Sequence, residues 1–270
     1  MEMNNIIILG VNADIGMNIC KLFQRDKFNI IGTFRKDFDG YDELKNLDGV
    51  QLIRCDITKP DDISRLTEFV RNQSFNWTTL FSSIGTSEPI GRFFDLNFNE
   101  WEQSININMT SQLRAIHSLY PFRNPSKTAN IALLAGGGTN NPFRCYSAYC
   151  LSKIGLIKMC ELIDDEAEDI NIFIVGPGFV KTKTHLETIK AGEKAENNLA
   201  RVKAFLDNTD DGTKFEDIYQ CLLWGNSAGR KVVGGRNISL VHDKWGTKAL
   251  ENALFSDKDM YKLRRFRNNF

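Results

Sequence analysis

The feature that most constrains the fold is a regular alternation of short apolar runs with longer amphipathic stretches. Three of the runs, IIIL at 6–9, IALL at 131–134 and IFIV at 172–175, contain no polar residue. Runs of this kind are typical of strands that are covered on both faces, as in a parallel sheet. Alternation of strands with helices implies that each helix connects two parallel strands by a right-handed crossover. The pattern therefore predicts an α/β fold with one doubly wound parallel sheet and helices on both faces.

The same alternation gives approximate bounds for the elements. We find no internal repeat, low-complexity tract or linker, which favours a single domain over residues 1–270. The expected strands are 6–9, 29–34, 50–55, 79–83, 131–135, 172–175 and 232–241. The expected helices are about 14–26, 60–73, 99–120 and 146–167, with two more beyond residue 190.

Composition excludes several classes of protein. Lys and Arg total 34, as do Asp and Glu, so the formal net charge is zero and no overall field attracts nucleic acid or an anionic membrane. No apolar run approaches the roughly 20 residues of a membrane span, and the N-terminus lacks the basic region of a signal peptide. The six cysteines show no metal-ligand spacing. We therefore expect reduced thiols in a cytoplasmic protein, with no metal site.

A glycine-bearing turn, GVNADIG at 10–16, follows the first expected strand and leads into an apolar-periodic helix. A dinucleotide site needs a tight turn there and a helix N-terminus that faces the pyrophosphate. Gly10 would make the turn, and Gly16 would allow close packing of helix on strand. We expect the carboxylate of Asp14 to cap the helix and so to point away from the pyrophosphate. An ordinary turn between strand and helix is the alternative.

The second expected strand ends in GTFRK at 32–36, without an acidic residue. An acid about 20 residues beyond the glycines would bind the ribose 2′-hydroxyl of NAD. Arg35 and Lys36 can instead pair with the 2′-phosphate of NADP. This part of the sequence therefore predicts that NADP(H) is preferred over NAD(H). The alternative is that Arg35 and Lys36 are ordinary solvated side chains at the end of a strand and bind no phosphate.

Tyr149 and Lys153 are four residues apart in an expected helix, so they lie on one face of it. A lysine beside a phenol would lower the pKa of the phenol. The tyrosine could then act as a general acid toward a carbonyl or as a general base toward an alcohol. The pair follows the fifth expected strand and precedes IFIVGPGFVKT at 172–182, a context that favours a catalytic role over chance.

With these motifs, nearly the whole chain resembles the classical type of the short-chain dehydrogenase/reductase family, whose fold is Rossmann-type. GVNADIG resembles the family's T-G-x-x-x-G-x-G turn, with Leu9 for the threonine and Asp14 for the middle glycine. SSIG at 82–85 lies where the family usually has N-N-A-G, and PGFVKT at 177–182 resembles its P-G-x-x-x-T loop.

The resemblance implies roles for individual residues. Tyr149 and Lys153 match the Tyr and Lys of the family's catalytic tetrad. Asn108, seven residues beyond Trp101, matches its asparagine and would anchor a water of a proton relay. The residues implied to bind the cofactor are Gly10, Asn12, Asp14, Ile15, Gly16, Arg35, Asp56, Ile57, Ser83, Gly85, Lys153, Pro177, Gly178, Val180 and Thr182.

The fourth member of the tetrad is missing. The family's serine lies about 13 residues before the tyrosine, where this chain has Gly136 in AGGGTNN. Three explanations remain open. Thr139 could replace the serine through a rearranged loop, backbone N–H groups of Gly136–Gly138 could replace it, or the chemistry could be impaired.

The resemblance implies an NAD(P)-dependent oxidoreductase that transfers a hydride between nicotinamide and a carbonyl or hydroxyl of a small molecule. The stretch at about 183–211 is rich in charged and polar residues and would form a lid over the substrate. Lys181, Lys183 and His185 at its entrance suit a polar or phosphorylated substrate. The turn and the AGGGT segment resemble members associated with bacterial surface-polysaccharide sugar biosynthesis, which suggests a keto-sugar or a nucleotide-linked sugar. A fatty-acyl or small-ketone substrate remains open. The alternative is a cofactor-binding sensor or structural subunit that has lost catalysis.

Two further expectations concern packing. The helix at 146–167 is apolar almost all round, so it and the helix at 99–120 are expected to meet a second subunit in a homodimer or homotetramer. The chain's own C-terminal segment is the alternative cover. Residues 243–270 are expected to form a helical extension of two short amphipathic helices, separated near Ser256 and packed near the lid.

Overall fold

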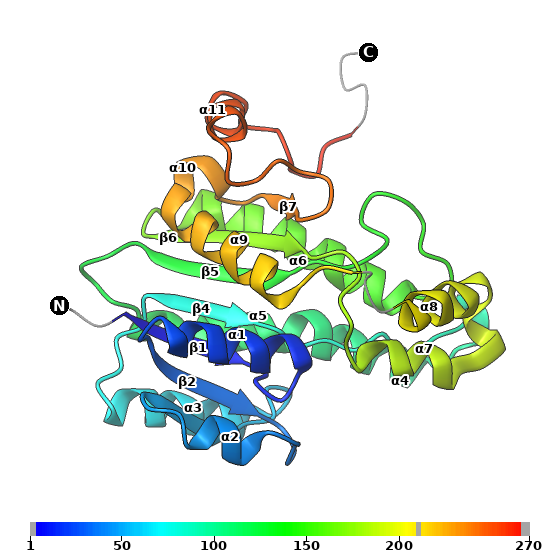
Figure 1. Ribbon diagram of the computed structural model, residues 1–270, viewed down its shortest axis with the longest axis horizontal. Helices are drawn as coiled ribbons and strands as arrows, with labels where there is room; N and C mark the ends of the chain where they lie inside the picture. The colour runs from blue at the N-terminus through cyan, green and yellow to red at the C-terminus, as the bar shows by residue number, and fades with distance from the viewer. Residues whose placement is uncertain (1–3, 209–211, 266–270) are drawn as a thin grey trace.

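The computed structural model describes residues 4–208 and 212–265, and it contains a seven-stranded, wholly parallel sheet in the order β3-β2-β1-β4-β5-β6-β7 (Figure 1). Its strands are β1 (Asn5–Leu9), β2 (Asn29–Phe34), β3 (Val50–Arg54), β4 (Thr79–Ser82), β5 (Ala129–Leu134), β6 (Ile170–Gly176) and β7 (Asn237–Ser239). The order reverses between β1 and β4, which is the topological switch point of a doubly wound sheet. The predicted α/β class and parallel sheet are confirmed.

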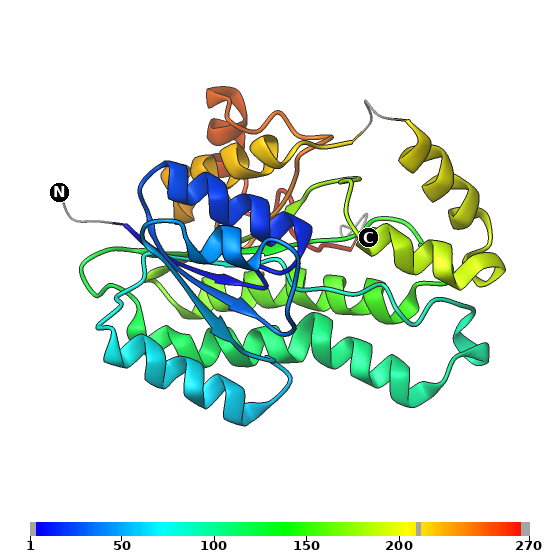
Figure 2. The ribbon, with the colours of Figure 1, turned by 60° about the horizontal axis from the view of Figure 1, so that its bottom comes forward.

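Helices cover both faces of the sheet, as Figure 2 shows, and alternating side chains of the strands are buried under them. Ile7 and Leu9 of β1 pack on one side, with helices α3 (Pro60–Asn72), α5 (Ser111–Leu119) and α6 (Ser147–Glu166). Ile6 and Ile8 pack on the other side. The helices of that second side are α1 (Asp14–Arg25), α2 (Tyr41–Lys45), α9 (Phe215–Ala228), α10 (Arg230–Val233) and α11 (Lys248–Ser256). Coverage of both faces is why these strands carry no polar alternation.

A third group of helices lies beyond the carboxyl ends of the strands. It consists of α4 (Phe98–Ile105), α7 (Thr184–Ala191), the short η4 (Gly192–Ala195) and α8 (Asn197–Asp207). In Figure 1 these helices extend from the sheet on the side toward which the strand arrows point. The helix expected at 99–120 is continuous in direction but contains a π-helical turn, η2 (Asn106–Thr110), between α4 and α5.

The last expected strand, 232–241, is shorter than predicted. Only Asn237–Ser239 pairs with β6, because the preceding residues form the short helix α10. Val233 of that helix is fully buried on the sheet. The apolar pair Val232-Val233 therefore marks a helix that packs on the core rather than the start of a strand. Periodicity alone does not distinguish the two for so short a run.

The C-terminal extension contains one of the two helices expected. α11 buries Leu250 and Leu254. Residues 257–265 form turns and no helix, so the prediction of a second helix is wrong for the residues that the structure describes. Buried Arg236 explains this, because its guanidinium donates hydrogen bonds to the carbonyl oxygens of Leu254 and Met260, each 2.6 Å away. The extension packs beside α10 and β7 of its own chain and not near α7 and α8 (Figures 1 and 2).

The structure also bears on membrane spans, disulfides and metal sites. None of the helices within 4–208 and 212–265 is long and apolar enough to cross a membrane. The six cysteines are all free thiols. In the part of the chain that the structure describes, no group of His, Cys, Asp and Glu side chains is arranged to hold a metal ion.

Candidate active site

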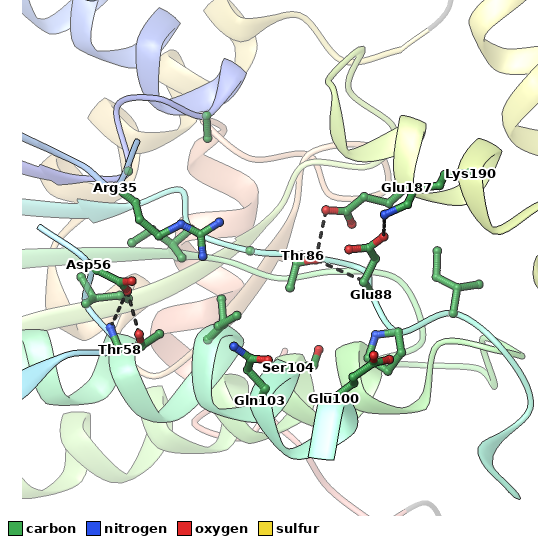
Figure 3. A pocket seen from close by; sticks show the side chains of 18 of the residues that line it. Arg35, Asp56, Thr58, Thr86, Glu88, Glu100, Gln103, Ser104, Glu187 and Lys190 are labelled. Atoms are coloured by element: carbon green, nitrogen blue, oxygen red, sulfur yellow. Dashed lines mark hydrogen bonds and ion pairs between the residues drawn. The ribbon is translucent and has the colours of Figure 1, made fainter. Parts of the chain in front are cut away.

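A large pocket opens at the carboxyl ends of β1, β2 and β4, where the strand order reverses. Its volume is about 880 Å³, and it runs from Arg35 and Asp56 past Gly85 to Glu187 on α7 (Figure 3). Of the residues predicted to bind the cofactor, six line this pocket: Gly10, Asn12, Arg35, Asp56, Ile57 and Gly85. Ligands of doubly wound sheets bind at this position, so the fold places the pocket where a dinucleotide is expected.

The turn after β1 has the geometry that a phosphate needs. Gly10 has φ 88°, a conformation that favours glycine, and its N–H donates to the carbonyl oxygen of Thr33. A Cβ on Gly16 would come closer than 3.0 Å to the carbonyl oxygen of Gly10 and to Ser83 Oγ. The turn expected at Gly10 and the close packing expected at Gly16 are both present, and their binding of a cofactor stays a prediction. Ser83 donates to the carbonyl oxygens of Leu9 and Gly10 and so holds the turn without lining the pocket.

Asp14 does not cap helix α1 as expected. The N-cap residue is Ala13, and Asp14 is the first helical residue, from which its side chain does not reach the free N–H groups of the turn. Its carboxylate instead accepts a hydrogen bond of 2.5 Å from the main-chain N–H of Lys183, just before α7. Ile15 beside it packs partly into the core. Asp14 thus joins the phosphate-binding turn to the segment predicted to form the lid.

The end of the pocket nearest β2 is lined by Arg35, Asp56 and Ile57. Asp56 accepts hydrogen bonds from the main chain and hydroxyl of Thr58, and Ile57 follows it in the pocket wall. Exposed Arg35 lines this end and also a second, adjoining hollow of about 440 Å³. The cationic side chains of that hollow are Arg35, Lys36, Arg54, Lys59 and Arg65.

Asn108 lies in the π-helical turn η2 and is fully buried. Its side-chain amide accepts from the N–H of Thr86 and donates to the carbonyl oxygen of Thr86, both at 2.9 Å. It also donates to Ser104 Oγ at 3.1 Å. The amide therefore holds the loop that follows β4 against α4, directly beside Gly85, where a Cβ would come within 3.4 Å of Asn108 Oδ1.

Lys153 and Tyr149 lie together on α6, as their spacing predicted. Lys153 Nζ donates to the carbonyl oxygen of Leu134 at 2.8 Å and lies 5.7 Å from the centre of the Tyr149 ring. A Cβ on Gly85 would also come within 3.8 Å of Lys153 Nζ. The structure thus gathers Tyr149, Lys153, Asn108 and Gly85 at the carboxyl ends of β4 and β5.

The expected electrostatic effect of Lys153 on Tyr149 is not found. Burial raises the pKa of Tyr149 above its ordinary value, and the nearby Cys150 and Glu187 raise it further. Burial lowers the pKa of Lys153 to about 8. Desolvation is the main cause of the shift in both groups, and neither shift has the other group among its causes. A phenol with a raised pKa is protonated near neutral pH, so it can donate a proton to a carbonyl oxygen.

Gly136 and Thr139 differ in their relation to Tyr149. A Cβ on Gly136 would come closer than 3.0 Å to the hydroxyl oxygen and ring of Tyr149, so the phenol tip rests against the Gly136 main chain. Among the described residues, Tyr149 Oη has no hydrogen-bond partner, and Thr139 neither bonds to it nor lines the pocket. The space that a serine side chain would fill is occupied by the tyrosine itself.

The P-G-x-x-x-T loop lies at the inner end of the site but outside the pocket lining. Gly178 has φ 73°, Pro177 accepts a hydrogen bond from the hydroxyl of Thr213, and Val180 is buried. Thr182 leads into α7 and accepts from the N–H of His185. The role of these four residues in binding the nicotinamide stays a prediction.

The cations expected at the lid entrance are engaged elsewhere. His185 Nε2 pairs with the carbonyl oxygen of Val180 at 2.9 Å, and its ring packs against Phe179 and Phe205. Lys181 donates to the carbonyl oxygen of Asn208, and Lys183 reaches Asp14. None of the three lines the pocket. Contacts with Asn208, Asp14 and Val180 take up these three side chains, whereas Lys190 and Lys194 of the same segment line the pocket.

Sequence analysis missed residues that α7 and the chain after β4 bring together. Glu187 accepts hydrogen bonds from Thr86 Oγ1 at 3.0 Å and from the N–H of Ser87 at 2.6 Å. Lys190 pairs with Glu88 at 2.9 Å (Figure 3). Glu187 lies 100 residues from Ser87 in sequence, and no local spacing signals such a contact.

This arrangement can bind an elongated dinucleotide along the strand ends and move a proton at its inner end. Such a cradle, with a Tyr–Lys pair on the helix after β5, defines an α/β oxidoreductase of the nicotinamide-dependent class. Residues 4–193 match the family model described as short chain dehydrogenase, which covers more than half of the chain. The protein belongs to this family.

Similar proteins agree with that assignment. An uncharacterized oxidoreductase of Staphylococcus saprophyticus is 26% identical over 193 residues, which cover 67% of this chain and 78% of the relative. A solved short-chain dehydrogenase/reductase from Saccharomyces cerevisiae superimposes with a TM-score of 0.80 at 20% identity, covering 92% of this chain and 98% of that one. An actinorhodin polyketide ketoreductase with NADPH has a TM-score of 0.75 at 16% identity, covering 88% and 95%.

Proposed function

We propose that the protein is an NADP(H)-dependent oxidoreductase that interconverts a carbonyl and a hydroxyl group of a polar small molecule, with a keto-sugar as the favoured substrate. The observation that carries the proposal is that Asn108 and Lys153 lie against Gly85, which lines the pocket, while Tyr149 lies beside Lys153 on α6 and Arg35 lines the end of the pocket nearest β2. When bound, the nicotinamide supplies or accepts the hydride.

The chain's own groups provide position and proton transfer. Gly10, Gly16 and the N-terminus of α1 form a cradle that a Cβ would fill, which fits a pyrophosphate. Lys153, fixed by Leu134, would hold the cofactor ribose. Tyr149, kept protonated by burial, would donate its proton to the substrate carbonyl oxygen during reduction. Asn108 would keep the chain around Thr86 in place beside the reacting groups.

The direct test has two stages. The protein is titrated with NADPH while the nicotinamide fluorescence is followed, and the complex is then screened with keto-sugars for oxidation of NADPH. Binding followed by turnover supports the oxidoreductase. Binding without turnover of any carbonyl compound supports instead the cofactor-binding sensor, the rival that the missing serine at Gly136 favours.

We expect Arg35→Ala to weaken NADPH binding about tenfold or more and to leave NADH binding unchanged. A guanidinium–phosphate pair contributes roughly 1.5–3 kcal/mol, and no carboxylate pairs with Arg35 in the described part of the chain. Dissociation constants for both cofactors, measured by the same titration, check this. Exposed Lys231 on α10 lies outside both hollows, so Lys231→Ala is the matched control. Equal affinity of the wild-type protein for the two cofactors would contradict the proposed preference.

We also propose that the protein is a homodimer or homotetramer through α4 and α6. Leu151 and Leu162 of α6 are exposed, and their separation of eleven residues places them on one side of the helix. Phe98 at the start of α4 is exposed as well and stacks on Trp101. Apolar side chains grouped in this way are typical of subunit contacts.

The expected result is a dimer or tetramer at micromolar concentration by sedimentation, and a monomer when Leu151 and Leu162 are both replaced by glutamate. Leu186 on α7 is equally exposed but lies on another helix, so Leu186→Glu should leave the assembly unchanged. A wild-type monomer, or an assembly that survives the double substitution, would refute this interface.

Two finer expectations stay predictions. The cytoplasmic location is supported by the six free thiols. A role in bacterial surface-polysaccharide biosynthesis is supported by the resemblance of the turn and the AGGGT segment. The pocket itself, with its many carboxylates, supports the keto-sugar over the nucleotide-linked sugar.

A further inference from the structure

Helix α7 is attached at several points to the part of the molecule that carries the reacting groups. Asp14 accepts from the N–H of Lys183 at one end of the helix. The hydroxyl of Thr188 pairs with that of Tyr146 at 2.8 Å, in a buried contact three residues before Tyr149. These bonds fix the helix so that the residue preceding Thr188, Glu187, points toward the pocket (Figure 3).

The carboxylate of Glu187 lies between the two halves of the site. One oxygen accepts from Thr86 Oγ1 and the other from the N–H of Ser87. The side-chain amide of Asn108 in turn forms hydrogen bonds with both the N–H and the carbonyl oxygen of Thr86. Gly85, the neighbour of Thr86, lies beside Lys153, whose Nζ a Cβ on Gly85 would approach to 3.8 Å. Glu187 is therefore next to the place where a substrate carbonyl must lie.

Glu187 retains unused hydrogen-bonding capacity and an unpaired charge. A carboxylate offers about four acceptor positions, and two hydrogen bonds occupy only some of them. No Lys, Arg or His side chain of the described residues forms an ion pair with Glu187, and the nearby ammonium of Lys190 pairs with Glu88. A half-buried carboxylate without a cation favours a ligand that donates hydrogen bonds or carries positive charge.

The surroundings reinforce this preference. Beyond Thr86 the pocket is lined by the carboxylates of Glu88, Asp95, Glu100 and Glu187 and by only two ammonium groups, those of Lys190 and Lys194. A ligand carboxylate or phosphate in this half of the pocket would be repelled, whereas a hydroxyl or an ammonium group would find acceptors.

We propose that Glu187 determines substrate specificity: its carboxylate accepts a hydrogen bond from a hydroxyl or ammonium group next to the substrate carbonyl, and it excludes anionic substrates. The inference rests on the proposed oxidoreductase function and narrows its substrates to uncharged polyhydroxy or amino-bearing carbonyl compounds.

The test compares two matched ketone series at saturating NADPH. The first is hydroxyacetone, aminoacetone, pyruvate and butanone, and the second is the phenyl ketones that carry the same hydroxymethyl, aminomethyl, carboxylate and ethyl groups. The wild-type kcat/KM is expected to be at least about tenfold higher for the hydroxyl and ammonium members than for the carboxylate member. A tenfold ratio corresponds to about 1.4 kcal/mol, which a single charge at this range supplies.

The variant Glu187→Gln keeps the shape and one acceptor oxygen but removes the charge. It should lower kcat/KM for the ammonium members about tenfold, raise it for the carboxylate members, and leave the ethyl members unchanged. A purely structural role would change all members alike. Exposed Glu193, which follows on η4 and does not line the pocket, gives the matched control Glu193→Gln, expected to behave as wild type.

The outcomes separate the two proposals. Turnover with the same order of preference in wild type and Glu187→Gln, or a wild-type preference for the carboxylate members, overturns the role of Glu187 while the oxidoreductase stands. Binding of NADPH without turnover of any member by either protein counts against the oxidoreductase itself, and the inference falls with it.

Discussion

Replacing Tyr149 by phenylalanine is expected to lower kcat about 10²–10⁴-fold, the range typical for loss of a general acid, and to leave the dissociation constant of NADPH almost unchanged. The substitution removes one hydroxyl, which bonds to no group among the described residues. Folding stability should therefore change little. The proton for the substrate oxygen would then have to come from water.

Steady-state kinetics and the fluorescence titration check this expectation on the same preparations. Tyr120 is a suitable control, because its hydroxyl bonds to Asp169 far from the pocket and Tyr120→Phe should keep full activity. Retained turnover in Tyr149→Phe would show that another group transfers the proton.

The second large effect is expected at Gly136. A Cβ there would come closer than 3.0 Å to the hydroxyl and ring of Tyr149, so Gly136→Ala must displace the phenol. A displacement of about 1 Å can cost roughly 10²-fold in rate, and we expect a fall in kcat of that order with NADPH affinity retained. Kinetics with the preferred substrate and a crystal structure of the variant measure both the loss and the shift.

Gly137 provides the matched control. A Cβ at that position would meet only the ring of Phe143, at 3.3 Å, which can move aside, so Gly137→Ala should remain nearly as active as wild type. Gly136→Ser is the informative companion, since it restores the family's serine. It is expected to lose activity as the alanine variant does, because both substitutions add a Cβ atom that displaces the phenol of Tyr149. Higher activity than wild type would instead show that the chain lacks a function that the serine supplies.

Local patterns in the sequence were sufficient for the fold class and for part of the site. Uninterrupted apolar strands such as Ile172–Val175 can be buried only between two layers of helices, and that requirement alone predicts the parallel sheet. The roles of Gly10 and Gly16 follow from a turn between a strand and a helix, and the Tyr149–Lys153 pair follows from the helical repeat. These interactions connect residues that are near one another in the chain.

Predictions from sequence patterns were wrong where a short segment could form its backbone hydrogen bonds in more than one conformation. Val232-Val233 has the composition of a strand but forms helix α10. The segment after Ser256 has helical periodicity but forms turns, because Arg236 takes the carbonyl oxygens of Leu254 and Met260. In both cases a contact with another part of the chain decided between conformations of similar local stability.

The chemistry around the substrate was decided by the tertiary structure. Asp14 was expected to cap α1, yet it bonds to Lys183, 169 residues away. Glu187 carries no local signature and reaches the site only because Asp14 and Tyr146 hold α7 in place. The pKa of Tyr149 is raised rather than lowered, because the phenol is buried in the folded molecule, and no spacing in the sequence encodes that burial. Turns and helices are specified by neighbours in the chain, whereas burial, lid contacts and the charge of a pocket depend on residues that meet only in the folded molecule.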